Sequence, residues 1–350
     1  MKQQKLRYLL SFMLIAALVQ NASAQTTSVT VVRENEQVEF PDSVPAGNYS
    51  GIASLGGNYY AVVSDKSKTD GFFVFKMDFD QRSGQIKSVR NLGFRDAHKP
   101  NRDGEGIAYL PLRRTILISG EADNAIKEYN LDGTLTGKNV EVPAVFSKAR
   151  PNYSLESLTF NETTGLLWTC SESTLYGDGS VATAVNKVRN RIRIQSFDSL
   201  MQAGKQYAYL MDAPEATTAT DLYAMGVSEM TALDDGSLLV LEREFFTPPS
   251  RLGAFVSNKI YQVFPAQSTP VEADRPLSDD SPFMKKALLT KWHTYFSLLD
   301  FSIANYEGMC LGPKLPNGSQ VIILLSDSQD QYGGVLKDWF KTIVVKKRTK

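Results

Sequence analysis

Acidic side chains open and close a short phrase that recurs along this chain, and they are the residues best suited to chemistry. In the clearest copy, Glu105 opens the phrase and Glu121 closes it after an apolar run. The other copies, in chain order, run from Ser50 to Asp65, from Glu156 to Glu172, from Glu229 to Glu242 and from Glu307 to Asp327. Flexible clusters of carboxylates bind Ca²⁺ through their oxygens. A fold that gathers these acids would therefore create a cation site.

Each phrase has the pattern of a β-hairpin, and this pattern decides where its acids lie. Turn-forming residues stand between the two halves, as in Gly56-Gly57-Asn58, Asp234-Asp235-Gly236 and Pro316-Asn317-Gly318. The start of one strand and the end of its antiparallel partner meet at the same edge of a sheet. We therefore expect the opening and closing acids of every phrase to face one rim.

The five hairpins, each followed by further strand patterns, predict an all-β fold, a β-propeller. Repetition of this kind is typical of repeat architectures, and four antiparallel strands in about 50 residues form one propeller blade. The openings at Glu105 and Glu156 are 51 residues apart, but 73 and 78 residues separate the next openings, Glu229 and Glu307. The sequence predicts five four-stranded blades, with room for a sixth in the long intervals. A long solenoid and a β-sandwich are the alternatives.

The two ends of the chain are expected to close the ring. Apolar residues alternate within residues 29–40, and the last strand pattern is Ile343-Val344-Val345. An open propeller would leave unpaired strand edges, so we expect a strand from residues 29–40 to pair with the last blade. Residues 25–350 then form a single propeller domain.

The first 24 residues have the pattern of a signal peptide. Lys2, Lys5 and Arg7 precede an apolar run at residues 9–19, and Ala22-Ser23-Ala24 is a small-residue cleavage site. We expect cleavage after Ala24 and a periplasmic or secreted protein, with an uncleaved anchor as the alternative. No later stretch is apolar enough to span a membrane.

Composition excludes several classes of partner. Loss of the three basic leader residues from 38 leaves 35 basic against 38 acidic side chains, a net charge of −3, which argues against binding to nucleic acids or anionic membranes.

Cys170 and Cys310 fall at strand positions that predict small buried residues, so we expect free thiols. We also expect a monomer.

Three motifs, taken in order, resemble the phytase-like family, bacterial proteins described as having esterase-like activity of phytase. The motifs are Arg102-Asp103-Gly104-Glu105-Gly106-Ile107-Ala108, Ser228-Glu229-Met230-Thr231 with Glu242-Arg243, and Asn305-Tyr306-Glu307-Gly308-Met309 with Ser326-Asp327. The resemblance runs from about Ser50 to Asp330 and implies an exported β-propeller distantly related to the calcium-dependent phytases. The chain departs from the family pattern at Ser50, where an acid would complete the ring, and after Asp327, where Ser328-Gln329 replaces the expected Asn.

A mouth lined by these acids predicts a Ca²⁺-assisted hydrolase of phosphate or related anionic esters. The expected metal ligands are Asp65, Glu105, Glu121, Glu156, Glu172, Glu229, Glu242, Glu307 and Asp327. The expected substrate-binding cations are Lys66, Arg102, Arg150 and Arg243, and the expected catalytic groups are Glu105, Glu229 and His98. A bound cation would polarise the ester and Arg would hold the anion.

Other functions remain open at this point. A Glu repeated in every blade can simply accept hydrogen bonds from the neighbouring blade, in which case the mouth binds a sugar, a peptide or a protein without catalysis. A metal-dependent lactonase on the same scaffold is a further alternative. The sequence has no Gly-x-Ser-x-Gly elbow, phosphate loop, zinc helix or Cys-x-x-Cys pair. His293, beside Trp292, is expected to pack rather than react.

Overall fold

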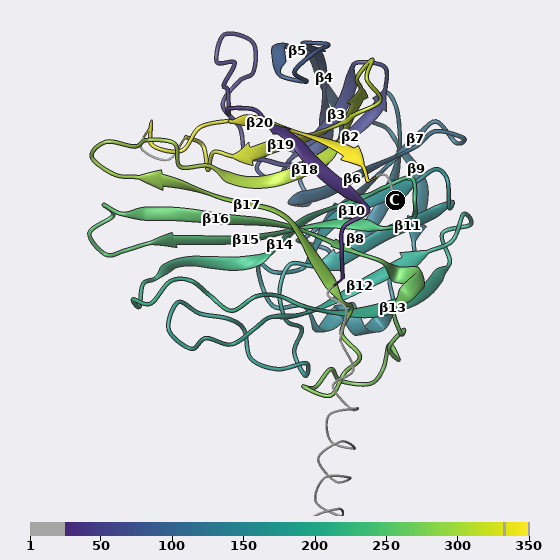
Figure 1. The fold of residues 1–350 in the computed structure, drawn as a ribbon. Helices are drawn as coiled ribbons and strands as arrows, with labels where there is room; N and C mark the ends of the chain where they lie inside the picture. The colour runs from purple at the N-terminus through teal and green to yellow at the C-terminus, as the bar shows by residue number, and fades with distance from the viewer. Residues whose placement is uncertain (1–24, 332–333, 349–350) are drawn as a thin grey trace, which may run out of the picture.

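Five antiparallel four-stranded sheets form a β-propeller in the computed structural model, which describes residues 25–331 and 334–348 (Figure 1). Blade one comprises β2 (Tyr49–Gly56), β3 (Tyr59–Ser64), β4 (Thr69–Phe79) and β5 (Ile86–Pro100). Blade two comprises β6 (Gly104–Leu110), β7 (Thr115–Gly120), β8 (Ala125–Asn130) and β9 (Leu135–Val140). Blade three comprises β10 (Leu155–Asn161), β11 (Leu166–Ser171), β12 (Arg191–Phe197) and β13 (Ala203–Leu210).

The remaining blades include the strand that closes the ring. Blade four comprises β14 (Leu222–Ala232), β15 (Leu238–Thr247), β16 (Ala254–Val263) and β17 (Lys286–Phe296). Blade five comprises β18 (Asn305–Lys314), β19 (Gln320–Asp327), β20 (Phe340–Lys347) and, as its outermost strand, β1 (Val29–Glu34). Within the described residues, the short 3₁₀ helices η1 (Ala144–Lys148) and η2 (Pro265–Gln267) lie in connections. The predicted count of five blades is confirmed.

The two chain ends meet in blade five, as the sequence predicted. β1 pairs antiparallel with β20, so the N-terminal strand completes the last blade. The innermost strands contact one another in a cycle: β2 with β6, β6 with β10, β10 with β14, β14 with β18, and β18 with β2. Closure leaves each inner strand covered by a neighbour on both sides, and this protects strand edges that would otherwise promote aggregation.

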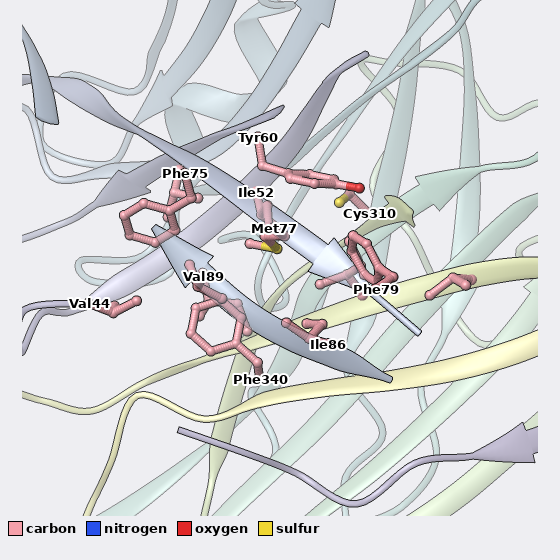
Figure 2. Close-up of a cluster of buried hydrophobic side chains, with 14 of the residues drawn as sticks. Val44, Ile52, Tyr60, Phe75, Met77, Phe79, Ile86, Val89, Cys310 and Phe340 are labelled. Carbon is pink, nitrogen blue, oxygen red and sulfur yellow. The ribbon is translucent and has the colours of Figure 1, made fainter. Parts of the chain in front are cut away.

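Apolar side chains between neighbouring blades hold the ring together. The five largest buried clusters each join two adjacent blades. Figure 2 shows the one between blades five and one, where Ile52, Phe75 and Met77 pack against Cys310 and Phe340. Packing on both faces explains why β7 is buried along its whole length, and β11 at every residue after its first, rather than at alternate residues.

Insertions, not a sixth blade, account for the two long intervals between phrases. Residues 172–190 form an irregular loop after β11, held by Arg193, which donates from Nε to Asp178 Oδ2 over 2.6 Å. The Pro-rich stretch after β16 folds back onto blade three, where Val271 pairs with Gln206 and Phe283 with Ala208. These contacts attach the stretch to β13.

Blade four is taller than its neighbours on one side of the ring. Its strands have 10 or 11 residues, whereas the inner strand of blade three has 7. In Figure 1 the green strands β15, β16 and β17 extend well beyond the centre of the molecule. Since a strand rises about 3.3 Å per residue, the extra residues raise a wall beside the ring.

Glycine is required where the inner strands approach one another most closely. A Cβ on Gly51 would lie 2.2 Å from the carbonyl oxygen of Glu105 in blade two. A Cβ on Gly106 would lie 2.5 Å from the amide nitrogen of Leu158 in blade three. The neighbouring atoms are backbone and cannot move aside, so the narrow neck of the ring depends on these glycines.

Gly51→Ala is therefore expected to lower the free energy of unfolding by about 1–3 kcal/mol, through forced separation of blades one and two. Urea unfolding measures the change. Gly104→Ala is the matched control, because its Cβ would meet side-chain atoms of Ile118 at 3.4 Å and of Val63 at 3.8 Å, which are ordinary contacts. Equal losses in the two variants would contradict the close approach at Gly51.

Three other sequence predictions concern the leader, membrane spans and the two cysteines. The predicted signal peptide at residues 1–24 lies outside the described residues. Over the described ranges, none of the helices is long and apolar enough to cross a bilayer. Cys170 and Cys310 are both buried free thiols, as predicted.

Candidate functional site

A β-bulge near the start of each inner strand sets the first group of residues at the mouth of the ring. In each blade the register between the first two strands shifts by one residue at this point. The extra residues, in blade order, are Ser50, Glu105, Glu156, Ser228 and Glu307. Bulges redirect side chains and are frequent beside functional sites. Three of the five positions are therefore acidic, and two carry a hydroxyl.

The second group of mouth residues lies on or just after the second strand of each blade. Each member directly follows the second-strand residue that pairs with the inner-strand residue before the bulge. Three of its members donate their backbone N–H to the residue just before the inner strand of the same blade, from Asp65 to Asn48, from Glu121 to Asp103 and from Glu172 to Ser154. In blade five Asp327 pairs with Asn305, and in blade four Arg243 pairs with Gly226. The equivalent residues are Asp65, Glu121, Glu172, Arg243 and Asp327. One blade thus supplies a guanidinium where the other four supply a carboxylate.

Glu242 therefore does not face the mouth, contrary to the sequence prediction. It pairs with Val227 and stands one residue before the equivalent position, so its side chain takes the opposite face of the strand. Its carboxylate accepts from Tyr209 Oη at 2.5 Å and lies 2.5 Å from Lys286 Nζ. Glu242 ties blade four to the end of blade three.

Glu229 is likewise one residue away from the predicted position. The bulge residue of blade four is Ser228, and Glu229 falls where the other blades have Gly51, Gly106, Ser157 and Gly308. Its carboxylate accepts the Met230 amide at 2.9 Å within the neck of the ring. Burial raises the pKa of Glu229 well above its usual range. Glu229 therefore lies apart from the other acids, and burial disfavours its charged form.

The remaining acids interact with one another, as the sequence predicted. Burial, followed by repulsion from Asp65, Glu307 and Glu121, raises the pKa of Glu105 well above its usual range. Burial also raises the pKa of Glu156, and Glu172, Glu105 and Glu307 add to the shift. Burial raises the pKa values of Glu172 and Asp327 to about 7 each. Carboxylates from four blades therefore share one poorly solvated cluster.

Arg243 is the cation at the centre of this cluster. Its Nη2 lies 2.6 Å from Glu172 Oε1 in blade three and 3.4 Å from Glu307 Oε1 in blade five. Gly226 makes room for the approach, because a Cβ there would lie 2.4 Å from Cγ of Glu172. Arg243 is only 5 % exposed, and its Nε has no hydrogen-bond partner. One guanidinium thus joins three blades and keeps a donor unused.

Several buried oxygens around the cluster also lack partners. They are Oγ of Ser50, Oδ1 of Asp65 and Oδ1 of Asn305. The Ser50 hydroxyl lies close enough to Glu105 to oppose the rise of its pKa, but it makes no hydrogen bond of normal geometry. Unpaired buried oxygens are costly, and a hard cation such as Ca²⁺ takes six to eight oxygen ligands. The donor set suits such a cation chemically.

The carboxylates do not form a ready-made metal centre. Across residues 25–331 and 334–348, no three His, Cys, Asp or Glu side chains are grouped closely enough to hold a metal ion. The side chains of Glu105, Glu156 and Glu307 would have to turn toward a shared ion. Calcium sites tolerate flexible geometry, so such a change is within reach of these side chains.

Most of the other predicted functional cations have structural partners. Arg102 is buried and contacts both carboxylate oxygens of Asp123, at 2.7 and 2.8 Å, and Tyr129 Oη at 2.7 Å. Arg150 donates to the carbonyl oxygens of Thr174 and Gly179. These contacts hold loops beside the mouth and occupy the guanidinium groups.

Lys66 and the two histidines complete the set. Lys66 lies at the mouth, with its Nζ 2.7 Å from Asp65 Oδ2. His98 lies on the outermost strand of blade one with its side chain 80 % exposed, and its ring contacts Asp96. His293 contacts Glu215 at 2.7 Å and stacks on Tyr295. The structure thus brings Lys66 to the acids but leaves His98 outside their cluster.

A cavity of about 560 Å³ opens between the tall wall of blade four and blade five, beside Arg243 and Glu307. Its apolar lining includes Leu222, Tyr223, Phe245, Phe296, Val335 and Leu336. Phe245 was not among the predicted site residues, and the structure places it on β15 at the edge of the cavity. The run Phe245-Phe246 was the available signal for a longer strand facing a cavity.

Stability of the cation-free protein is expected to fall as pH rises from about 4 to 8. The folded state holds protons on Glu172 and Asp327 up to about pH 7, but the unfolded chain releases them near pH 4. The native state therefore binds more protons in that interval, so stability declines with pH by up to about 1.4 kcal/mol per unit for each group. The raised pKa values of Glu105, Glu156 and Glu307 add to the decline, while Arg243 opposes the rise at Glu156 and Glu307.

Thermal unfolding in a chelator at pH 5, 6.5 and 8 measures this trend. Added Ca²⁺ is expected to raise the melting temperature more at pH 8 than at pH 5, because cation binding requires ionised carboxylates. A melting temperature that rises with pH would contradict the proton linkage.

Comparisons with known proteins agree with the repeat analysis. The sequence model of the Phytase-like family, described as "Esterase-like activity of phytase", matches residues 44–329. No curated protein matches the sequence. Among solved structures, streptogramin B lyase is 13 % identical, with 89 % of this chain and 98 % of that one covered and a TM-score of 0.37. A DUF4221 member from Bacteroides vulgatus is 10 % identical, with 93 % and 100 % covered and a TM-score of 0.37.

The family match includes all five inner hairpins, from blade one through Asp327 of blade five. It therefore spans every residue of the carboxylate cluster and its single arginine. By its sequence, the chain belongs to the Phytase-like family.

Proposed function

We propose that the protein is an exported hydrolase of phosphate or related anionic esters, assisted by Ca²⁺ bound at the carboxylate cluster. The observation that carries this proposal is the unused Nε of Arg243, buried among acids from neighbouring blades. Membership of the Phytase-like family supports a hydrolase in general, without indicating the metal, the substrate or the active-site residues.

The cation would be held by Asp65, Glu105, Glu156, Glu307 and Asp327, together with the unpaired oxygens of Ser50 and Asn305. When bound, Ca²⁺ would polarise the ester oxygen and neutralise the repulsion between the acids. Glu121 is engaged with the backbone amide of Ser154 at 3.1 Å, so it would act as an outer support.

Arg243, Glu105 and Lys66 would each have a separate role in binding the substrate or activating water. Arg243 Nε would donate to an anionic oxygen of the substrate, while Nη2 stays on Glu172 and fixes the guanidinium plane. Glu105, which faces Asp65, Glu121 and Glu307, would accept the proton of a water held in the mouth. Lys66 would attract the anion from solvent, because its side chain is 55 % exposed.

The test is hydrolysis by purified protein with and without a chelator. We expect aryl phosphate or carboxylic ester turnover at millimolar Ca²⁺, its loss on chelation and its return with added Ca²⁺. No turnover of either ester class would overturn the proposal and leave a binding propeller. Lactone hydrolysis restored by Zn²⁺ or Mn²⁺, without phosphatase activity, would point to a lactonase.

The proposed export is tested separately. A tagged full chain should appear in the periplasmic or secreted fraction with its N-terminus at Gln25. Retention of residues 1–24 would contradict cleavage and favour an anchor.

A further inference from the structure

We infer that the ligand of the mouth carries an apolar limb beside its anionic group, and that the cavity between blades four and five holds that limb. This inference rests on the proposed function and narrows the substrate from anionic esters in general to amphiphilic ones. It follows from the position, lining, charge and surroundings of the cavity.

The cavity and the carboxylate cluster share residues. Arg243, Asn305 and Glu307 line the cavity and belong to the mouth. An anion that accepts a hydrogen bond from Arg243 Nε would therefore have its remaining part directed along the wall of blade four or into solvent. The volume of about 560 Å³ is in the usual range for a small-molecule site.

The lining discriminates against a highly charged ligand. Its two guanidinium groups, Arg243 and Arg251, are balanced by the carboxylates of Asp221 and Glu307, so the cavity offers no excess positive charge. A polyanion such as an inositol polyphosphate would place further phosphates against aromatic and aliphatic side chains. Burying such charges without partners is costly, whereas burying an alkyl or aryl group is favourable.

The apolar surface continues from the cavity to the outside of blade four. The ring of Phe296, which lines the cavity, packs edge-on against Phe301 with 5.5 Å between centroids. Phe301 is 59 % exposed, and in the preceding turn Leu298 and Leu299 are 77 % and 96 % exposed. A long apolar limb could therefore extend along this path.

Alkylphosphonates of increasing chain length test the inference, because their carbon–phosphorus bond resists hydrolysis. In titration calorimetry with 1 mM Ca²⁺, we expect the affinity to rise about threefold to fourfold for each added methylene until the cavity is filled. Inositol hexakisphosphate should bind no more tightly than methylphosphonate once Ca²⁺ chelation by the free ligand is subtracted. An affinity that does not change with alkyl chain length would overturn the inference. This measurement uses the wild-type protein alone.

Ala224→Phe fills the cavity from β14, where Ala224 is half-buried and pairs with Phe245. This variant should lose the chain-length dependence but keep the wild-type affinity for methylphosphonate. Ala203→Phe, on an exposed position of β13 outside the cavity, is the matched control and should behave as wild type. Unchanged chain-length dependence in Ala224→Phe would place the limb elsewhere.

The two proposals fail in different ways. Chain-length-dependent binding without turnover of any ester would refute the hydrolase and leave the cavity assignment intact. Turnover of short esters with a flat phosphonate series would refute the cavity assignment alone.

Discussion

Replacing Arg243 by Met is expected to lower the free energy of unfolding by about 3–5 kcal/mol at pH 8, because it leaves buried carboxylates without their cation. Nη2 of Arg243 contacts Glu172 at 2.6 Å and lies 3.4 Å from Glu307, and both acids are almost inaccessible to solvent. Met keeps most of the volume, so packing contributes little to the loss. Urea unfolding in a chelator measures it.

The same substitution should cost much less at pH 5. Glu172 titrates at about pH 7 even beside Arg243, and removal of the guanidinium would raise its pKa further. At pH 5 the carboxyl is then neutral and requires no counter-charge. Arg243→Lys, which keeps the charge, should restore part of the stability at pH 8. Losses of equal size at pH 5 and pH 8 would mean that Arg243 acts through packing.

A double substitution measures the interaction between Arg243 and Glu172. Glu172→Gln in the Arg243→Met background should recover stability at pH 8, since it removes the uncompensated charge. If ester hydrolysis is present in the wild type, the double variant should still lack it, because Arg243 Nε is the proposed donor to the anion. Recovery of activity together with stability would remove Arg243 from substrate binding.

Replacing Glu105 by Gln is expected to weaken Ca²⁺ binding by about tenfold or more, because it removes one charged ligand from the set. Glu105 is the bulge residue of blade two and faces Asp65, Glu121 and Glu307. Gln has the same shape and can still accept one hydrogen bond. Titration calorimetry at pH 8 measures the affinity, with circular dichroism to confirm the fold.

Glu242→Gln is the matched control for Glu105→Gln. Both acids are buried in the second and fourth copies of the phrase, but Glu242 contacts Tyr209 and Lys286 away from the mouth. Its substitution should leave the Ca²⁺ affinity within about twofold of wild type, although it should cost stability. If Glu242→Gln weakens binding as much as Glu105→Gln, the assignment of residues in blade four would be wrong.

The sequence was sufficient for the architecture because every phrase repeats the same hairpin. Turn residues such as Asp235-Gly236 and the apolar runs between acids specify strands and their order. Closure by β1 also followed from the sequence, since an unpaired edge next to β20 would be unfavourable. The common rim for Glu105, Glu156, Glu172 and Glu307 followed from antiparallel pairing alone.

The register of blade four did not follow from the sequence. The sequence pattern predicted that Glu229 is equivalent to the opening acids of the other blades, whereas the structure places the bulge at Ser228 and brings Arg243 to the mouth. A shift of one residue moves a side chain to the other face of a strand, and nothing local indicates which residue a bulge leaves unpaired.

Contacts between distant segments decided the rest. Arg102 and Arg150 looked available beside the acids, but Asp123 and the carbonyl oxygens of Thr174 and Gly179 occupy them. The apolar cavity exists only because the extra length of β14 to β17 stands against residues that follow blade five's second strand. Sequence alone determined the repeated hairpins and their acidic rim, because those depend on local pairing. Tertiary structure decided which side chains meet there, because burial and partner choice depend on neighbouring blades.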